Sequence, residues 1–243
     1  MKNCALITGA SGGIGSEIAL RLAKDGFRIA ACYHSDENGI LELEKKLMQI
    51  GAEYRLYRAD VADYEQIKKI FADAAEVFGG VSVLVNNAGI AQQKLFTDIT
   101  PEEFDRITAI NFKGVYNCCH CAVPYMISQK RGKIINISSM WGVCGASCET
   151  VYSATKAAVI GLTKSLAREL APSNIQVNCI APGAIDTKMN NNLSDEDKAA
   201  FANEIPMGRF GTAKEIAGVV SFLAGDDSDY VTAQVITADG GLT

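Results

Sequence analysis

Tyr152 and Lys156 lie four residues apart, a spacing that could support proton transfer. On a helix of 3.6 residues per turn they share one face, about 6 Å apart along the axis. A cation at this distance favours the phenolate, so Lys156 is expected to lower the pKa of Tyr152 from its usual value of about 10. Ser139 comes thirteen residues before the tyrosine, where its hydroxyl could orient a carbonyl oxygen. Alone, the pair also fits ordinary surface packing, and Ser138-Ser139 also fits a helix cap.

A glycine-rich segment, residues 8–15 (Thr-Gly-Ala-Ser-Gly-Gly-Ile-Gly), lies between an apolar run and a helical pattern. Glycines permit a tight turn and let backbone N–H groups approach a phosphate, and a helix N-terminus adds partial positive charge. The strand before and the helix after this segment predict a dinucleotide-binding loop.

Apolar runs alternate with amphipathic helical patterns along the whole chain. The expected strands are 4–8, 28–33, 54–59, 82–86, 132–138, 175–180 and 233–238. Helices are expected between them, ending at Gly26, Gly51 and Gly79-Gly80, with long helices near 101–129 and 152–171. A short helix should begin at Ser194. The pattern predicts an α/β fold over residues 1–243: a single doubly wound Rossmann domain with about seven parallel strands and helices on both faces.

The composition of the chain argues against several classes of partner and site. The chain has 243 residues, 48% of them hydrophobic, and a net charge of −5, which argues against nucleic acid and anionic membranes as partners. No signal peptide or membrane span is evident, so a cytoplasmic location is expected. The eight cysteines are expected to be buried, reduced thiols. No metal site is expected, because the chain has two histidines and Cys118, Cys119, His120 and Cys121 share one helix.

The glycine spacing resembles that of the short-chain dehydrogenase/reductase family, and further motifs extend the resemblance over nearly the whole chain. Residues 86–89 (Asn-Asn-Ala-Gly), Asp60-Val61, and Pro182-Gly183 followed by Thr187 match family motifs. The resemblance implies an NAD(P)-dependent oxidoreductase acting on CH–OH groups. It implies four catalytic residues: Asn111 in a proton relay, Ser139, Tyr152 and Lys156. The cofactor-binding residues that it implies are Thr8, Gly9, Ser11, Gly13, Ile14, Gly15, Tyr33, His34, Ser35, Asp60, Val61, Asn87, Ala88, Gly89, Lys156, Pro182, Gly183 and Thr187.

The end of the second strand bears on the choice between NADP and NAD. NAD-selective members of the family tend to carry an acidic residue where Tyr33 stands, and its absence favours NADP while leaving NAD open. His34 and Ser35 could contact a 2′-phosphate, and Asp36 could oppose it. Many NADP-dependent members carry a basic residue where this chain has Gly12.

The substrate is a ketone whose identity the sequence leaves open. The candidate substrate residues are Trp141, Cys144, Glu149 and Met189, with Val143 and Phe201 as further pocket residues. The broadest resemblance is to 3-oxoacyl carrier-protein reductases, which implies acyl carrier protein as a partner and a basic docking patch near the pocket that Lys130 and Arg131 could supply. Ser173-Asn174 stands where many such reductases have an arginine, which weakens this interpretation.

A more local resemblance covers residues 138–142 and 145–149. These residues are similar to those of a reductase of Gram-positive bacteria that acts on a 5-aminopentanone group on a lysine of elongation factor P. Glu149 would suit a substrate that carries an amine, although it could instead favour a helix dipole. Hydroxysteroid or sugar alcohol oxidation and a non-catalytic dinucleotide-binding scaffold are further alternatives. The family resemblance also implies a homotetramer.

Overall fold

The computed structural model describes residues 3–187 and 194–243. Its strands are β1 (Cys4–Thr8), β2 (Arg28–Tyr33), β3 (Tyr54–Arg58), β4 (Val83–Asn86), β5 (Gly132–Ile137), β6 (Ile175–Pro182), β7 (Ile185–Asp186), β8 (Gly211–Thr212) and β9 (Val235–Ala238). A seven-stranded parallel sheet has the order β3-β2-β1-β4-β5-β6-β9. This order reverses between β1 and β4, as in a doubly wound Rossmann fold. The predicted fold class is therefore confirmed.

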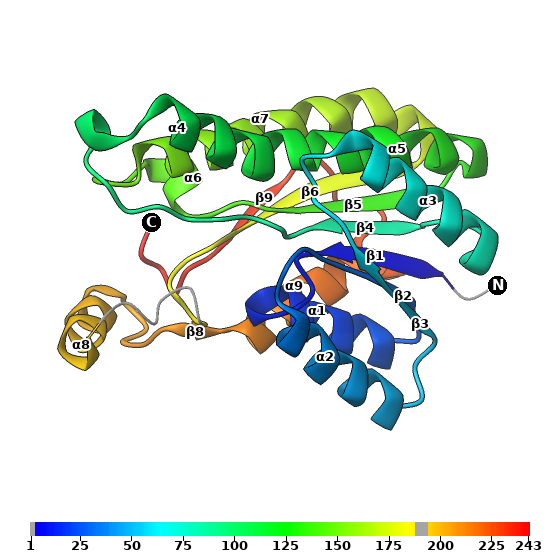
Figure 1. Ribbon diagram of the computed structural model, residues 1–243, viewed down its shortest axis with the longest axis horizontal. Coiled ribbons are helices and arrows are strands. Elements are labelled where there is room, and N and C mark those ends of the chain that lie inside the picture. Colours follow the sequence, from blue (N-terminus) through cyan, green and yellow to red (C-terminus); the bar gives the residue numbers. More distant parts are fainter. Residues whose placement is uncertain (1–2, 188–193) are drawn as a thin grey trace.

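Two helix layers cover the sheet. The helices are α1 (Gly13–Lys24), α2 (Glu37–Gln49), α3 (Tyr64–Phe78), α4 (Pro101–Thr108), α5 (Gly114–Gln129), α6 (Trp141–Cys144), α7 (Thr150–Leu170), α8 (Asp195–Glu204) and α9 (Ala213–Ala224). Helices α1, α2 and α9 lie on one face, and α3, α5 and α7 lie on the other (Figure 1). A π-helical turn at Ala109–Lys113 joins α4 to α5. The predicted helix over 101–129 is therefore interrupted by this turn.

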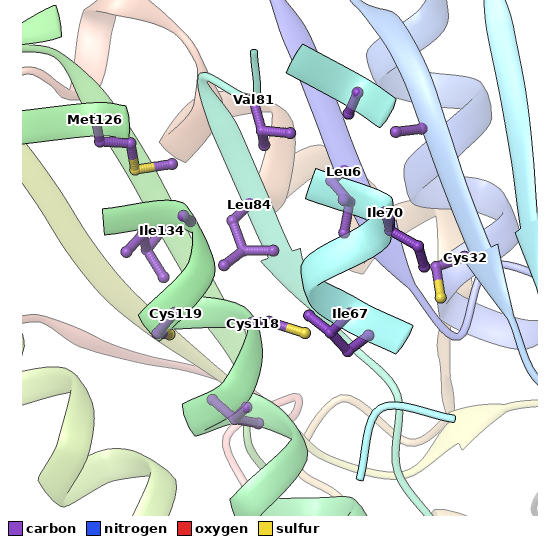
Figure 2. Packing of buried hydrophobic residues seen from close by; sticks show 14 of the residues in the cluster. Leu6, Cys32, Ile67, Ile70, Val81, Leu84, Cys118, Cys119, Met126 and Ile134 are labelled. Atoms are coloured by element: carbon purple, nitrogen blue, oxygen red, sulfur yellow. The ribbon is translucent and has the colours of Figure 1, made fainter. Parts of the chain in front are cut away.

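Alternation along the strands divides the core into two clusters. In β1, Leu6 faces the cluster that packs against α3 and α5, whereas Ile7 faces the cluster under α1, α2 and α9. Figure 2 shows the first cluster, in which Leu6, Ile67 and Cys118 come from three different elements. Burial on both faces explains why β1, β2 and β4 are almost continuously apolar in sequence.

The cysteines only partly follow the sequence prediction. All eight are free thiols, and Cys4, Cys32, Cys118, Cys119 and Cys179 are buried as expected. The prediction of burial is wrong for the other three. Cys144 is exposed, and Cys121 and Cys148 are half-buried, because all three lie on helix or loop surfaces rather than between the layers.

Several local predictions can be compared with the structure. Helices α1, α2 and α3 end within two residues of the predicted glycines, and Ser194 caps α8 by accepting a hydrogen bond from the Asp197 amide at 3.1 Å. Within residues 3–187 and 194–243, no helix is long and apolar enough to cross a bilayer. The same part of the chain holds no group of three His, Cys, Asp or Glu residues able to bind a metal ion.

Candidate active site

The predicted chemical residues converge on the edge of the sheet where the parallel strands have their carboxyl ends. Ser139 follows β5, and Tyr152 and Lys156 occupy the first two turns of α7. The Ser139 hydroxyl forms a hydrogen bond with the Tyr152 phenol. The neighbouring Ser138 is turned away from the phenol, since its Oγ donates to the Lys156 carbonyl oxygen at 2.9 Å. The geometry therefore separates the two serines, and Ser139 is the one beside the tyrosine.

Burial controls the protonation of this site. Burial is the largest reason why the pKa of Tyr152 is raised to about 12, and within this balance the hydrogen bond with Ser139 acts to lower the pKa and the negative charge of Glu149 acts to raise it. Burial also lowers the pKa of Lys156 to about 8. The predicted lowering of the Tyr152 pKa by Lys156 is thus wrong for this structure. The physical reason is that Lys156 Nζ donates to the Ile137 carbonyl oxygen at 2.9 Å and lies 5.7 Å from the centre of the tyrosine ring.

Asn111 lies in the π-helical turn and is fully buried. Its Oδ1 accepts from the Ile90 amide at 2.8 Å, and its Nδ2 donates to the Ile90 carbonyl at 2.9 Å and to Thr155 Oγ1 at 3.3 Å. A Cβ atom on Gly89 would stand 3.3 Å from both Asn111 Oδ1 and Lys156 Nζ. The Asn111 amide oxygen and the Lys156 side-chain nitrogen therefore both lie next to Gly89, the last residue of the predicted motif at residues 86–89.

The glycine loop forms a close-fitting cradle between β1 and α1. A Cβ atom on Gly15 would lie 2.2 Å from the Gly9 carbonyl oxygen, so only glycine fits there. Gly13 has φ +53°, and its Cβ position lies 3.5 Å from the Thr187 side chain. Backbone N–H groups at the start of α1, with no side chain in the way, suit a pyrophosphate. The residues present thus fit the dinucleotide that the sequence predicts.

Two side chains fix this cradle to the loop after β4. Thr8 Oγ1 is buried and accepts from the amides of Asn87 and Ala88, each at 3.0 Å. Asn87 Nδ2 donates to the carbonyl oxygens of Thr8 at 3.0 Å and Gly9 at 3.1 Å. Thr8 and Asn87 therefore position the two loops relative to each other.

The remaining predicted cofactor residues line the same edge. Pro182 ends β6, and its carbonyl accepts from the Met140 amide at 2.9 Å, which holds Gly183 beside the loop after Ser139. Asp60 Oδ1 accepts from the Ala62 amide at 2.9 Å, and Val61 is buried. Ser11 and Ile14 belong to the cradle itself and are half-buried.

At the end of β2 the structure adds a residue that the sequence reasoning missed. Tyr33 is half-buried, and His34 and Ser35 are exposed. Arg58, the last residue of β3, pairs in register with Tyr33, and its Nε donates to the His34 carbonyl oxygen at 3.2 Å. The pairing of β3 with β2 places this cation there, so the available signal in the sequence was a basic residue one position before the end of the third predicted strand.

The predicted substrate residues are only partly brought together. Trp141 and Cys144 lie on the short helix α6, directly after Ser139. Cys144 Sγ donates to the Met140 carbonyl at 3.3 Å and is exposed. Met189 lies outside the described residues. Val143 is also exposed, and Phe201 instead packs edge-on against Phe210, with the ring centres 5.6 Å apart.

Glu149 immediately precedes α7 and is half-buried. It occupies the N-cap position of α7 without a capping hydrogen bond, and a negative charge at this end of a helix favours the helix dipole, as the predicted alternative requires. Burial raises the pKa of Glu149, and its charge raises the pKa of Tyr152, which places the carboxylate beside the phenol.

The predicted contribution of Lys130 and Arg131 to a basic docking patch near the pocket is wrong. Lys130 and Arg131 precede β5, whereas Ser139 follows it, so the six residues of the strand separate them by roughly 20 Å. Arg131 is also paired with Asp226 at 2.9 Å. Asn174, where an arginine was expected, instead donates from Nδ2 to the Lys130 carbonyl oxygen at 3.3 Å.

Comparison with known proteins covers the whole length of the chain. The family model described as "Enoyl-(Acyl carrier protein) reductase" matches residues 9–243. The 3-oxoacyl-[acyl-carrier-protein] reductase FabG of Staphylococcus aureus strain Mu50 is 43% identical over 242 residues, covering 100% of this chain and 98% of that protein. FabG of Thermotoga maritima is 43% identical over 237 residues, with 98% and 96% covered. The uncharacterized oxidoreductase YmfI of Bacillus subtilis is 37% identical over 242 residues, covering 99% of each.

Proposed function

The chain belongs to the short-chain dehydrogenase/reductase family, and from this premise we propose that it is an NADPH-dependent reductase of a 3-oxoacyl thioester carried by acyl carrier protein. At the coarser level it is an NAD(P)-dependent oxidoreductase that interconverts a ketone and a secondary alcohol. The observation that carries the proposal is the pairing of buried Ser139 with half-buried Tyr152, whose ring centre lies 5.7 Å from Lys156 Nζ, in a chain that matches FabG proteins along its full length.

Tyr152 is the proposed proton donor. With a pKa of about 12 its phenol is neutral at pH 7, so it holds the proton that the carbonyl oxygen needs. The Ser139 hydroxyl, bonded to the phenol, orients the same carbonyl oxygen. When bound, the reduced nicotinamide supplies a hydride to the carbonyl carbon. The new C–H bond and the proton from Tyr152 together convert C=O to CH–OH.

Lys156 and Asn111 form the proposed route that returns a proton to Tyr152. A Lys156 pKa of about 8 leaves the ammonium mostly charged at pH 7 yet able to give up its proton. Asn111 Oδ1 and Lys156 Nζ each lie 3.3 Å from the position that a Cβ atom on Gly89 would take. Lys156 is also placed to contact the nicotinamide ribose.

The cofactor residues are assigned to the edge already described. Gly9, Ser11, Gly13, Ile14 and Gly15 hold the pyrophosphate, and Thr187 adjoins it from the loop after β7. NADP is preferred over NAD because no acidic side chain stands at Tyr33. Asp60 and Val61 bound the adenine, and Ala88, Gly89, Pro182 and Gly183 bound the nicotinamide.

Substrate choice is tested by comparing two ketones under identical conditions. NADPH oxidation is measured with an acetoacetyl thioester of acyl carrier protein and with elongation factor P bearing the 5-aminopentanone-modified lysine. We expect fast turnover of the thioester, and Tyr152→Phe should lower it by about 10²- to 10⁴-fold. The exposed Tyr230 supplies a matched control, since Tyr230→Phe should leave turnover unchanged. No turnover of the thioester by the wild type would contradict the proposal.

One observation favours a second substrate, the aminated ketone on elongation factor P. Glu149 is a half-buried carboxylate beside Tyr152 without a capping hydrogen bond, and a substrate ammonium would compensate its charge. If this substrate is correct, Glu149→Gln should reduce kcat/KM for the modified protein about tenfold more than it reduces kcat/KM for the thioester. An equal effect on both ketones would argue against it. Hydroxysteroid and sugar alcohols and a scaffold role gain no comparable support.

Assembly and location complete the proposal. We propose one catalytic domain over residues 1–243, a homotetramer and a cytoplasmic location, with no nucleic-acid or membrane partner. Phe104, Tyr116 and Ile127 are each 44–49% exposed along α4 and α5, which gives the helix layer an apolar outer surface for contact between copies. Light scattering coupled to gel filtration measures the mass, and a monomer would contradict the tetramer.

A further inference from the structure

Arg58 stands at the corner of the cofactor cradle that faces the adenosine ribose. It is the last residue of β3, and the sheet register sets it directly beside Tyr33, the last residue of β2. The Ala59 amide donates to the Tyr33 carbonyl at 2.9 Å, so the backbone on both sides of Arg58 is fixed to β2. In this fold the ribose 2′ position lies at the end of β2, where an arginine accommodates a 2′-phosphate.

Two hydrogen bonds orient the guanidinium of Arg58, and they occupy only some of its N–H donors. Its Nε donates to the His34 carbonyl at 3.2 Å, and Nη1 donates to Glu37 Oε1 at 3.0 Å. Among the described residues, Nη2 has no hydrogen-bond partner. The side chains of Arg58 and Glu37 are each 63% exposed, so water screens their ion pair and a doubly charged phosphate would compete well for the guanidinium.

Gly12, another candidate position near this corner, offers no cation. Gly12 replaces the basic residue found in many NADP-dependent members of the family. A Cβ atom there would lie 3.7 Å from Asp36 Oδ2, so an acidic side chain borders that position. Asp36 Oδ1 accepts from the Gly39 amide at 2.9 Å, which keeps this carboxylate at the start of α2. Arg58 supplies a permanent positive charge on the β3 side of this corner.

We propose that Arg58 is the residue that recognises the 2′-phosphate of NADP in this protein, and that Glu37 weakens this recognition by competing for the guanidinium. This inference rests on the NADP preference proposed above. His34 and Ser35 border the same site, with the His34 carbonyl holding the guanidinium in place. Discrimination between the two dinucleotides would then depend on a strand that pairs with β2 and not with β1, the strand that leads into the glycine loop.

Isothermal titration with two nucleotides tests the proposal without the ketone reaction. The probes are 2′,5′-ADP and 5′-AMP, which differ only in the 2′-phosphate. For the wild type we expect 2′,5′-ADP to bind at least tenfold more tightly. Arg58→Gln should weaken 2′,5′-ADP binding about tenfold and leave 5′-AMP within twofold, and Arg58→Lys should lose less. Glu37→Gln should strengthen 2′,5′-ADP binding several-fold.

A matched control comes from the same strand. Arg55 is also exposed and ion-paired, with its Nε 3.3 Å from Asp73 Oδ2, and Arg55→Gln removes the same charge without the predicted effect. Equal binding of both probes by the wild type would overturn both the NADP preference and this inference. Tighter binding of 2′,5′-ADP that survives Arg58→Gln would overturn the inference alone. Thermal melting of each variant shows whether it is folded.

Discussion

Replacing Lys156 by methionine should make the folded protein more stable while abolishing turnover. Lys156 is 4% exposed, and burial lowers its pKa from 10.5 to about 8. At 1.36 kcal/mol per pH unit, holding the charged form at pH 7 costs about 3 kcal/mol. Methionine loses the hydrogen bond to the Ile137 carbonyl, a contribution of about 1–2 kcal/mol. The expected net gain in the free energy of unfolding is about 1–2 kcal/mol at pH 7.

The pH dependence gives an independent check on the same reasoning. Between about pH 8 and 10.5 the unfolded chain keeps the lysine proton that the folded chain has released. Stability from this site therefore rises with pH across that window. Lys156→Met lacks this contribution, so its advantage over the wild type should shrink as the pH rises from 7 to 10.

Urea unfolding followed by far-ultraviolet circular dichroism at both pH values measures the two effects. Lys164→Met, at an exposed position two turns further along α7, controls for the loss of a lysine. NADPH oxidation should be lost in Lys156→Met and kept in the control. A Lys156→Met protein that is less stable than the wild type at pH 7, with the same pH dependence, would refute the reasoning.

Three further outcomes are expected. Gly15→Ala should abolish detectable binding of 2′,5′-ADP in calorimetry, because its Cβ atom would lie 2.2 Å from the Gly9 carbonyl; unchanged binding would contradict the cradle. Thr212→Ala should lower the urea midpoint, with a loss of about 1 kcal/mol, since Thr212 and Glu215 form the capping box of α9; an unaltered midpoint would show that the box adds nothing. The kcat/KM for ketone reduction should decline above about pH 8 as Lys156 loses its proton, and a profile flat to pH 10 would exclude this dependence.

The strands were predictable because burial on both faces leaves a direct trace in the sequence. β2 was predicted as 28–33 and is observed at Arg28–Tyr33, and β4 differs from its prediction by one residue. The strand order was not predicted, because apolar runs do not show which strands pair with each other. The two-residue strands β7 and β8 were missed because two residues carry no periodicity.

The positions of site residues that belong to a motif could be predicted from the sequence. Properties that depend on packing, such as a pKa or a contact between neighbouring strands, were harder to predict. The positions of Ser139, Tyr152 and Lys156 followed from spacing, but their ionisation did not, because desolvation depends on what the fold places around them. Lys130 was misplaced because its end of β5 was not considered. Arg58 was overlooked because it approaches His34 only through the pairing of β2 with β3.

The π-helical turn at Ala109–Lys113 lies between α4 and α5, and it rotates the side-chain faces of α5 about the helix axis relative to those of α4. An α-helix advances about 100° per residue, whereas a π turn accommodates one residue more, so the faces of α4 and α5 are offset by about that angle. Removing one residue from the turn would let the helix become regular, yet it would rotate the Asn111 amide away from Ile90. The effect of an insertion or deletion in this helix should therefore depend more on the rotation that it causes than on the number of residues changed. A change of seven residues keeps the helix faces within about 20° of their original directions, and a change of one residue does not.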